Sequence, residues 1–349
     1  MLYKCFEKRE WWLISATIKD VAAAAGVSVG TVSKLINKSG YVSDKIRERV
    51  LLAITLLNYQ PNAVARSLKQ SKTHLLGLIV DDISNPSITK MMKSIEDAAR
   101  NKSYNLIICS HNNDSDQEMK AFQWLQEKRV DGIIAIPTGA ELDELQLPSS
   151  IPIMTVERKV KYNRFYSVVH ENIHSSFSLV QHLYIHGCRR LLFIHGPLLD
   201  HVEQERHQGI RQAIGQLGLD PELQIFLEAG TDIASISGAV SSHLGSSGLP
   251  EGIYATNRLS LAGTIQALWS MDIKVPGDVA VAGFGDIDPY GILRPTLTAA
   301  KEDFNEVGKI AAEILFERIE NKMRYNQPKE FIVAPRLFIG TSCGSHSHS

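Results

Sequence analysis

The hydrophobic pattern changes character along the chain. From residue 75 onward, short apolar runs alternate with helix-length amphipathic stretches such as residues 87–103 and 118–129. The apolar runs cover residues 75–80, 105–110, 131–136, 151–156, 191–196, 224–229, 252–256 and 279–284. Strands that alternate with helices predict parallel sheets covered by helices on both faces. This region is long for one such unit, so we expect two lobes.

Before residue 60 the pattern is helical. Thr17 and Asp20 stand three apart before an apolar run, which is typical of a capped helix start. Gly26 can take the positive φ that ends a helix, and Ser28 is a favourable N-cap for a second one. Two helices joined by a short turn with glycine predict a helix-turn-helix. A third helix begins at Ser43, and its apolar stripe is Ile46, Val50, Ala53, Ile54 and Leu57.

The second of these helices has two different faces. Its outer face is small and rich in donors, and it carries one cation; it consists of Gly30, Ser33, Lys34 and Asn37. Val32, Leu35 and Ile36 lie on the inner face and can pack on the first helix. Small residues allow close approach to the major groove, and hydroxyl, amide and ammonium groups can donate to phosphates or bases. The alternative is an amphipathic helix with a solvated face.

The sequence of residues 58–73 predicts a short helical segment that becomes ordered only against a binding partner. Pro61 ends the third helix, and residues 62–69 allow only about two helical turns, which are marginal in isolation. Leu68 lies between Arg66 and Lys69, so it can serve as a wedge in the minor groove. Packing against the same segment of a second subunit is a simpler role, and both are compatible.

Charge separates this region from the rest. Residues 15–72 carry nine basic and three acidic side chains, a net +6, whereas the whole chain has a net charge of -1. A basic head on an acidic body indicates that only the head binds a polyanion. A solvated basic surface is the alternative that charge alone leaves open.

Composition excludes several classes of protein. No apolar stretch of about 18 residues exists, so no transmembrane helix or membrane partner is expected. The four cysteines are far apart and form no metal or disulfide pattern, which points to the cytosol. Residues 1–15 are read as an extension outside the fold or as the product of an upstream start codon. His182 and His186 are four apart, but no nearby carboxylate completes a metal site.

The stretches "TIKDVAAAAGVSVGTVSKLIN" and "LNYQPNAVARSL", at residues 17–37 and 57–68, resemble the DNA-binding head and hinge helix of the lac repressor family (LacI/GalR). The resemblance implies that Val29, Gly30 and Lys34 read bases. It implies a minor-groove wedge at Leu68, with Ala65 beside it. The other predicted DNA contacts are Thr17, Ser28, Thr31, Ser33 and Asn37. Gly30 departs from the side chains common in the family, so we expect close approach there in place of a hydrogen bond.

The resemblance also implies the domain organisation. We expect a small all-α helix-turn-helix head and an α/β two-lobed, periplasmic-binding-protein-like body with parallel sheets. The expected parts are an extension (1–15), a DNA-binding domain (16–60), a hinge helix and linker (61–73), an effector-binding and dimerisation domain (74–340), and a tail (341–349). The chain should cross between the lobes near residues 168, 295 and 328.

Ligands of open parallel sheets bind beyond the carboxyl ends of the strands. By resemblance, the effector contacts are Ser87, Arg158, Arg206, Arg258 and Asp286. Arg206 fits the family motif R-x-x-G, whereas Arg258 stands where an aspartate is common, and Ser87 and Ile88 stand where aromatic residues are common.

Three arginines in one cleft favour an anionic effector, because a guanidinium binds carboxylate or phosphate in a bidentate manner. We therefore expect a sugar acid or a sugar phosphate. A neutral sugar or a nucleoside is the alternative, and it holds if Arg258 pairs with Asp286 or Glu157.

The sequence has no Walker loop, no H-E-x-x-H and no G-x-S-x-G motif, so we expect no enzyme, no catalytic residues, no metal and no cofactor. The predicted function is a sequence-specific transcriptional regulator, most simply a repressor. Its predicted partners are a double-stranded DNA operator, a small-molecule effector and a second copy of the chain in a homodimer. The alternative outside this class is a solute-binding protein, which would have no use for a basic head.

Overall fold

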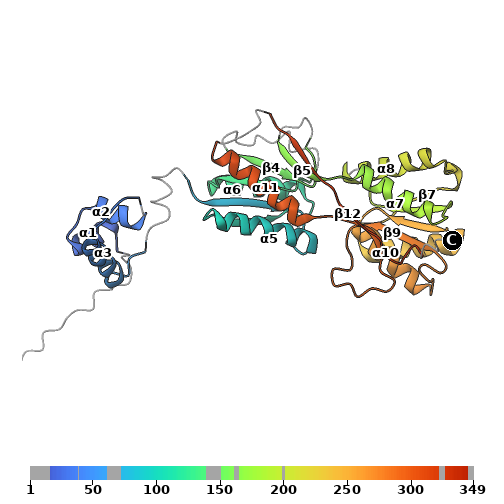
Figure 1. The fold of residues 1–349 in the computed structure, drawn as a ribbon, viewed down its shortest axis with the longest axis horizontal. Helices are drawn as coiled ribbons and strands as arrows, with labels where there is room; N and C mark the ends of the chain where they lie inside the picture. Colours follow the sequence, from blue (N-terminus) through green and yellow to red (C-terminus); the bar gives the residue numbers. More distant parts are fainter. Residues whose placement is uncertain are drawn as a thin grey trace, which may run out of the picture. The chain divides into compact units, whose positions relative to one another are not determined.

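The structure is a computed structural model that describes residues 16–37, 39–60, 72–138, 151–160, 165–198, 201–321 and 327–344. The chain divides into two compact units, Met1–Thr73 and His74–Ser349, which we call the head and the body (Figure 1). The expected extension, residues 61–71 of the expected hinge segment and residues 345–349 of the expected tail lie outside the described residues.

The head contains three helices: α1 (Ile18–Ala25), α2 (Val29–Ile36) and α3 (Asp44–Leu56). Thr17 and Asp20 form the predicted capping box, in which the Thr17 N–H donates to Asp20 Oδ2 over 2.8 Å. Gly26 ends α1 in the left-handed region with a φ of 62°. Ser28 caps α2 by accepting from the N–H of Thr31 over 3.2 Å.

The three helices enclose a small core. Its buried members are Val21, Ala22, Ala25, Val32, Val50 and Ala53. Ile46 and Ile54 pack against it as expected, whereas Leu57, at the C-cap of α3, keeps 37% of its surface exposed. The stripe on α3 therefore stops one turn earlier than the sequence indicates, because the helix ends at Leu56.

The body contains two six-stranded sheets, one in each lobe. The first has the order β11-β5-β4-β3-β1-β2, and all its strand pairs are parallel. Its strands are β1 (Leu75–Val80), β2 (Asn105–Ser110), β3 (Gly132–Ala135), β4 (Ile153–Val156), β5 (Tyr166–His170) and β11 (Glu330–Val333).

The second sheet has the order β12-β10-β9-β8-β6-β7. Its strands are β6 (Leu191–His195), β7 (Ile225–Glu228), β8 (Gly252–Ala255), β9 (Ala280–Phe284), β10 (Thr298–Lys301) and β12 (Arg336–Phe338). Only β12, which pairs with β10, runs antiparallel within this sheet. The predicted fold class is confirmed, and each of the eight apolar runs contains a strand.

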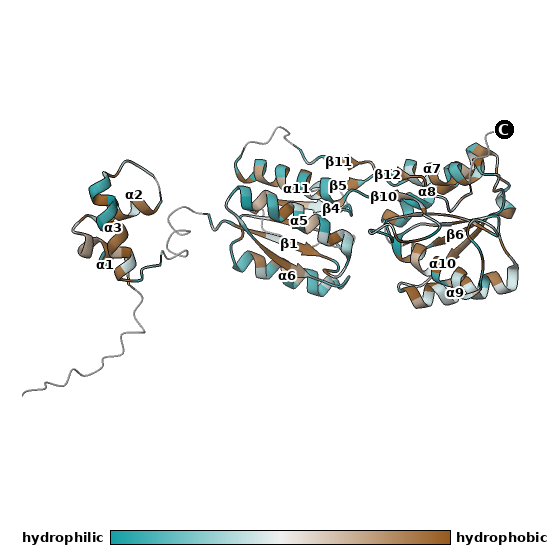
Figure 2. Cartoon of the chain, turned by 60° about the horizontal axis from the view of Figure 1, so that its bottom comes forward, coloured by the Kyte–Doolittle hydropathy of each residue, from teal (hydrophilic) through white to brown (hydrophobic). Residues whose placement is uncertain are grey.

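Helices cover both faces of each sheet. In the first lobe, α5 (Pro86–Asn101) and α11 (Phe304–Ile319) pack on one face and α6 (Ser115–Glu127) on the other. In the second lobe, α7 (Ile173–Ile185) and α8 (His201–Leu217) cover one face, and α9 (Ile233–Ser247) and α10 (Arg258–Ser270) cover the other. A short 3₁₀ helix, η3 (Pro221–Leu223), precedes β7. Figure 2 shows hydrophobic strands between helices of mixed character. No described helix is both long and apolar enough to span a bilayer.

The chain passes between the lobes three times. It leaves β5 for α7 at residues 171–172, leaves β10 for α11 at 302–303, and leaves β11 for β12 at 334–335. Each crossing lies a few residues after the expected position near 168, 295 or 328. The reason is that β5, β10 and β11 stay in their sheets up to residues 170, 301 and 333.

Candidate DNA-binding face and ligand cavity

The outer face of α2 is open to solvent. Gly30, Lys34 and Asn37 are exposed, and Val29 keeps 41% of its surface exposed. Val32 is fully buried on the opposite side. The helix therefore presents small and donor-bearing groups outward while its apolar side fixes it to the head, as recognition in a groove requires.

Local hydrogen bonds orient the polar groups of this face. The hydroxyls of Ser28 and Thr31 lie 2.9 Å apart at the start of α2, and Asn37 Nδ2 donates to Ser33 Oγ over 3.1 Å at its end. The start of a helix offers N–H groups to a phosphate, and Ser28 and Thr31 extend that donor set. Thr17 is exposed at the start of α1, whereas Ala65 and Leu68 lie outside the described residues.

A cavity of about 500 Å³ lies in the body and is lined by residues of both lobes. Most of its polar lining follows the carboxyl ends of strands, as the parallel topology predicts. The sequence-predicted residues Ser87, Arg158, Arg206 and Arg258 all line it. Phe304, from the start of α11, is an aromatic side chain in its wall for which the sequence gives no signal.

Arg206 is held by contacts from three other segments. Its Nε donates to Asn172 Oδ1 over 2.9 Å, one Nη donates to the carbonyl of Thr256 over 2.8 Å, and the other to Glu302 Oε1 over 2.6 Å. Its guanidinium carbon lies 3.6 Å from the centre of the Phe284 ring. Burial alone would lower the pKa of Arg206, but the Glu302 carboxylate raises it, so the side chain is a fixed buried cation.

Glu203 lies one turn before Arg206 on α8, and it anchors the loop that follows β8. Its carboxylate accepts from Thr256 Oγ1 and from Asn257 Nδ2, each over 2.6 Å. Asn257 in turn caps α10 by accepting from the N–H of Ser260 over 2.8 Å. Glu203 therefore fixes the start of α10, where Arg258 enters the cavity.

The other two arginines differ from Arg206. Arg158 donates to Asn113 Oδ1 and to the carbonyl of Pro137, each over 3.1 Å, and its Nη2 lies 3.8 Å from Asp81 Oδ2. No hydrogen bond or ion pair joins the guanidinium of Arg258 to any residue that the structure describes. A Cβ on Gly285 would lie 3.0 Å from the Cβ of Arg258, so glycine at 285 makes room for this side chain.

Asp286 differs in position from the other predicted effector contacts. It does not line the cavity but a separate hollow of about 50 Å³, and its Oδ1 lies 3.1 Å from Lys301 Nζ. The cause is local: Gly285 takes a φ of 98°, and Asp286 then accepts from the N–H of Asp288 over 3.1 Å in the following turn. The proposed pairings of Arg258 with Asp286 or Glu157 are likewise absent among the described residues.

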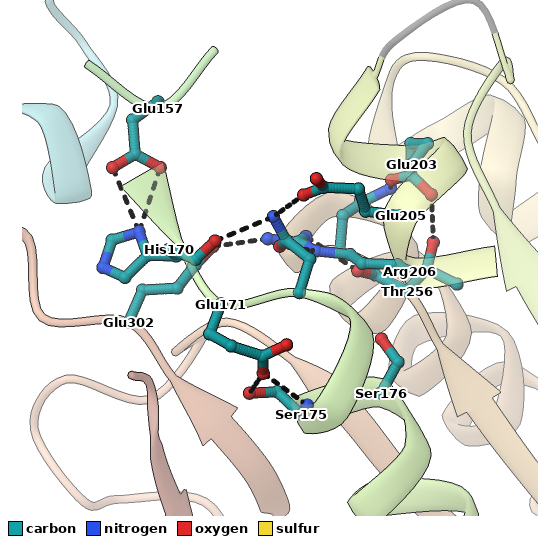
Figure 3. A network of polar contacts seen from close by, with 12 residues as sticks. Glu157, His170, Glu171, Ser175, Ser176, Glu203, Glu205, Arg206, Thr256 and Glu302 are labelled. Atoms are coloured by element: carbon teal, nitrogen blue, oxygen red, sulfur yellow. Dashed lines mark hydrogen bonds and ion pairs between the residues drawn. The ribbon is translucent and has the colours of Figure 1, made fainter. Parts of the chain in front are cut away.

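Glu157, His170 and Glu302 form a second charged group at the cavity wall (Figure 3). Both carboxylate oxygens of Glu157 lie close to His170 Nδ1, at 3.0 and 3.1 Å. Burial alone would lower the pKa of His170, but the Glu157 carboxylate raises it. The His170 ring also packs edge-on against Phe304, with centroids 5.1 Å apart.

Potential metal-ligand atoms of these three residues lie within 4.8 Å of one another, close enough to hold a cation. Each carboxylate nevertheless has a partner in the protein, since Glu157 faces His170, which is cationic when protonated, and Glu302 faces Arg206. With His170 protonated, the contacts of this group are those of two adjacent ion pairs.

Comparison with known proteins identifies the chain. Residues 17–62 match a model described as "Bacterial regulatory proteins, lacI family", and residues 180–343 match one described as "Periplasmic binding protein-like domain". The ribose operon repressor of Halalkalibacterium halodurans is 31% identical over 321 residues, which cover 91% of this chain and 96% of the relative. The chain belongs to the lacI family. The resemblance stated from the sequence is thereby confirmed.

Other relatives of this lacI-family protein carry similar names. The ribose operon repressor of Bacillus subtilis is 31% identical, and the transcriptional repressor PurR of Aliivibrio salmonicida is 29% identical; each alignment covers 88% of this chain and 93% of the relative. Among solved structures, a lac repressor dimer bound to operator and an anti-inducer shares the fold with a TM-score of 0.84 at 21% identity. The alignment covers 95% of this chain and 100% of the lac repressor chain.

Proposed function

We propose that this lacI-family protein is a repressor that acts in the cytosol and binds a two-fold operator as a homodimer. The main support for this proposal is that Val29, Gly30 and Lys34 are all exposed on the outer face of α2. In the proposal these three residues read bases, while Thr17, Ser28, Thr31, Ser33 and Asn37 contact the backbone. Ala65 and Leu68 complete the proposed contacts from the hinge segment.

We further propose that the cavity binds a neutral, hydroxyl-rich sugar. The comparisons do not support the anionic effector expected from three arginines, because the relatives cited above are named as ribose or PurR repressors. The cavity offers a physical reason. Arg206 is neutralised by Glu302 and Arg158 lies near Asp81, so two of the three cations already have anionic neighbours.

Paired charges suit a polyhydroxyl ligand. The guanidinium of Arg206 has five N–H donors, of which three are used, so two can serve sugar hydroxyls while the ion pair persists. Ser87, Arg158 and Arg258 are the further proposed contacts, and Phe304 offers an apolar surface for a sugar ring.

One experiment tests both parts. Purified protein is used to select duplexes from a random DNA pool. The affinity of the protein for the most strongly selected duplex is then measured by fluorescence anisotropy, with and without sugars. We expect specific binding to a pseudo-palindrome and a response to a neutral pentose or related sugar. If no sequence is selected, the proposed repressor function is wrong. If DNA binding responds to sugar acids or sugar phosphates alone, the proposal of a neutral effector is wrong.

A further inference from the structure

Lys159 joins the two lobes. It follows β4 in the first lobe, and its Nζ lies 2.8 Å from Oε1 of Glu205 on α8 in the second lobe. The same ammonium lies 3.1 Å from Oε2 of Glu330 at the start of β11. The side chains of Lys159, Glu205 and Glu330 are each less than a third exposed. Water and salt therefore screen the Lys159–Glu205 pair less than they screen a surface ion pair.

Glu205 collects donors from three directions. Besides Lys159, it accepts from His201 Nε2 over 3.2 Å on its own helix and from Asn172 Nδ2 over 3.0 Å. Burial alone would raise the pKa of Glu205, but these hydrogen bonds hold it at about 2. The carboxylate therefore stays ionised, and its bond to Lys159 persists across the physiological range of pH.

Asn172 connects this ion pair to the cavity. It lies in the first crossing between the lobes and is only 3% exposed. While its Nδ2 donates to Glu205, its Oδ1 accepts from Arg206 Nε over 2.9 Å. One buried amide thus contacts both an arginine of the cavity wall and the carboxylate of the interlobe pair. Glu302, which holds the far side of Arg206, lies in the second crossing.

We propose that Asn172 is a positioning residue that couples ligand contacts at Arg206 to the interlobe ion pair Lys159–Glu205. A ligand that shifts the Arg206 guanidinium must change the Asn172 amide, and the amide cannot move without altering its bond to Glu205. The ligand thereby changes the relative stability of two lobe orientations, which is the requirement for an allosteric signal. The inference rests on the proposed function, because it assigns the regulation of that same cavity.

The first test removes the interlobe charge. The measured quantity is the ratio of operator affinities without and with the active sugar. In Lys159→Met we expect this ratio to fall at least about fivefold, within the usual range of allosteric coupling. Lys159→Arg keeps the charge and should retain the ratio. Lys102→Met is a matched control, because it removes an ion pair of the same 2.8 Å length, with Glu320, that lies within the first lobe.

A second test asks whether the residues act as one unit. Glu205→Gln should lower the ratio as Lys159→Met does, and the double variant should be no worse than either single one, because both break the same contact. Asn172→Asp keeps an acceptor for Arg206 but replaces the donor to Glu205 by a negative charge. It should therefore retain sugar binding, measured by calorimetry, and lose the effect of sugar on DNA.

These outcomes separate the inference from the proposed function. If the wild-type protein binds no operator or no sugar, the proposed function fails. If wild type couples the two and Lys159→Met stays within about twofold of its ratio, the inference alone is wrong. Amide hydrogen exchange provides a readout without DNA or sugar: Lys159→Met should speed exchange across residues 166–180, and unchanged exchange there would overturn the interlobe link.

Discussion

Gly209 on α8 lies directly against the backbone of Ile173 at the start of α7. A Cβ at position 209 would lie 2.1 Å from the carbonyl oxygen of Ile173, so only glycine allows the two helices to approach this closely. Arg206 stands one turn before Gly209, and Asn172 immediately precedes Ile173. The helix contact thereby brings Arg206 Nε within 2.9 Å of Asn172 Oδ1. The glycine of the R-x-x-G motif positions its arginine.

Gly209→Ala should destabilise the body by about 3 kcal/mol, because the added methyl meets backbone that can yield only by separating α7 from α8. The measurement is urea unfolding. Gly215→Ala is the matched control on the same helix, since a Cβ there has no described heavy atom within 4 Å. That control should be more stable than wild type by about 1 kcal/mol, because alanine favours helix. Equal effects of the two substitutions would contradict the packing argument.

Arg206→Met should abolish the response to sugar and lower the stability of the body by about 3–5 kcal/mol, because Glu302 would be left as a buried charge without its partner. Calorimetry and urea unfolding measure the two effects. Arg211→Met, in the exposed part of the same helix, should change neither by much. Sugar binding that survives in Arg206→Met would remove this residue from the proposed site.

The stability of the body should fall as pH rises. Because the pKa of His170 is raised in the folded protein, its pairing with Glu157 contributes fully below the usual value of about 6.5. The contribution is lost as pH rises through the higher folded value. Urea midpoints between pH of about 6 and about 9 should therefore drop more in wild type than in His170→Gln or Glu157→Gln. An identical drop in all three proteins would show that another group controls this range.

Lys34→Ala should weaken binding to the selected operator by about 10- to 100-fold, as expected for loss of a base contact. Fluorescence anisotropy at several salt concentrations measures the effect and its salt dependence. Lys309→Ala, which removes an equal charge from α11 of the body, should leave operator affinity unchanged. Equal weakening by both variants would indicate a general charge effect and not recognition by α2.

The head could be predicted from the sequence almost residue by residue, because its structure is set by short-range signals. Thr17 caps a helix with a partner three residues away, and Gly26 and Ser28 act within a single turn. Leu57 is the exception, since whether a helix adds one more residue depends on packing that the pattern does not contain.

The cavity was predictable only in part. Looking beyond apolar strands leads to the segments that contain Ser87, Arg158 and Arg258, and the family resemblance selects these residues within them. By contrast, β10 reads "TAAK" and carries too little hydrophobic signal to be recognised as a strand. Glu302 follows it and was therefore missed. Asn172 and Glu302 contact Arg206 from 34 and 96 residues away, and such pairings arise from tertiary structure alone. Asp286 lines the separate hollow and not the cavity, and the left-handed φ of Gly285 just before it leaves no trace in the hydrophobic pattern.

The charge pairs Arg206–Glu302 and Arg158–Asp81 in the cavity wall limit how tightly a ligand can bind there. Three of the five N–H donors of Arg206 already bind Asn172, Thr256 and Glu302, so a ligand that disturbs these bonds gains only the difference between its own contacts and the ones it weakens. If the cavity holds the proposed sugar, the protein should therefore respond to it only at high concentration.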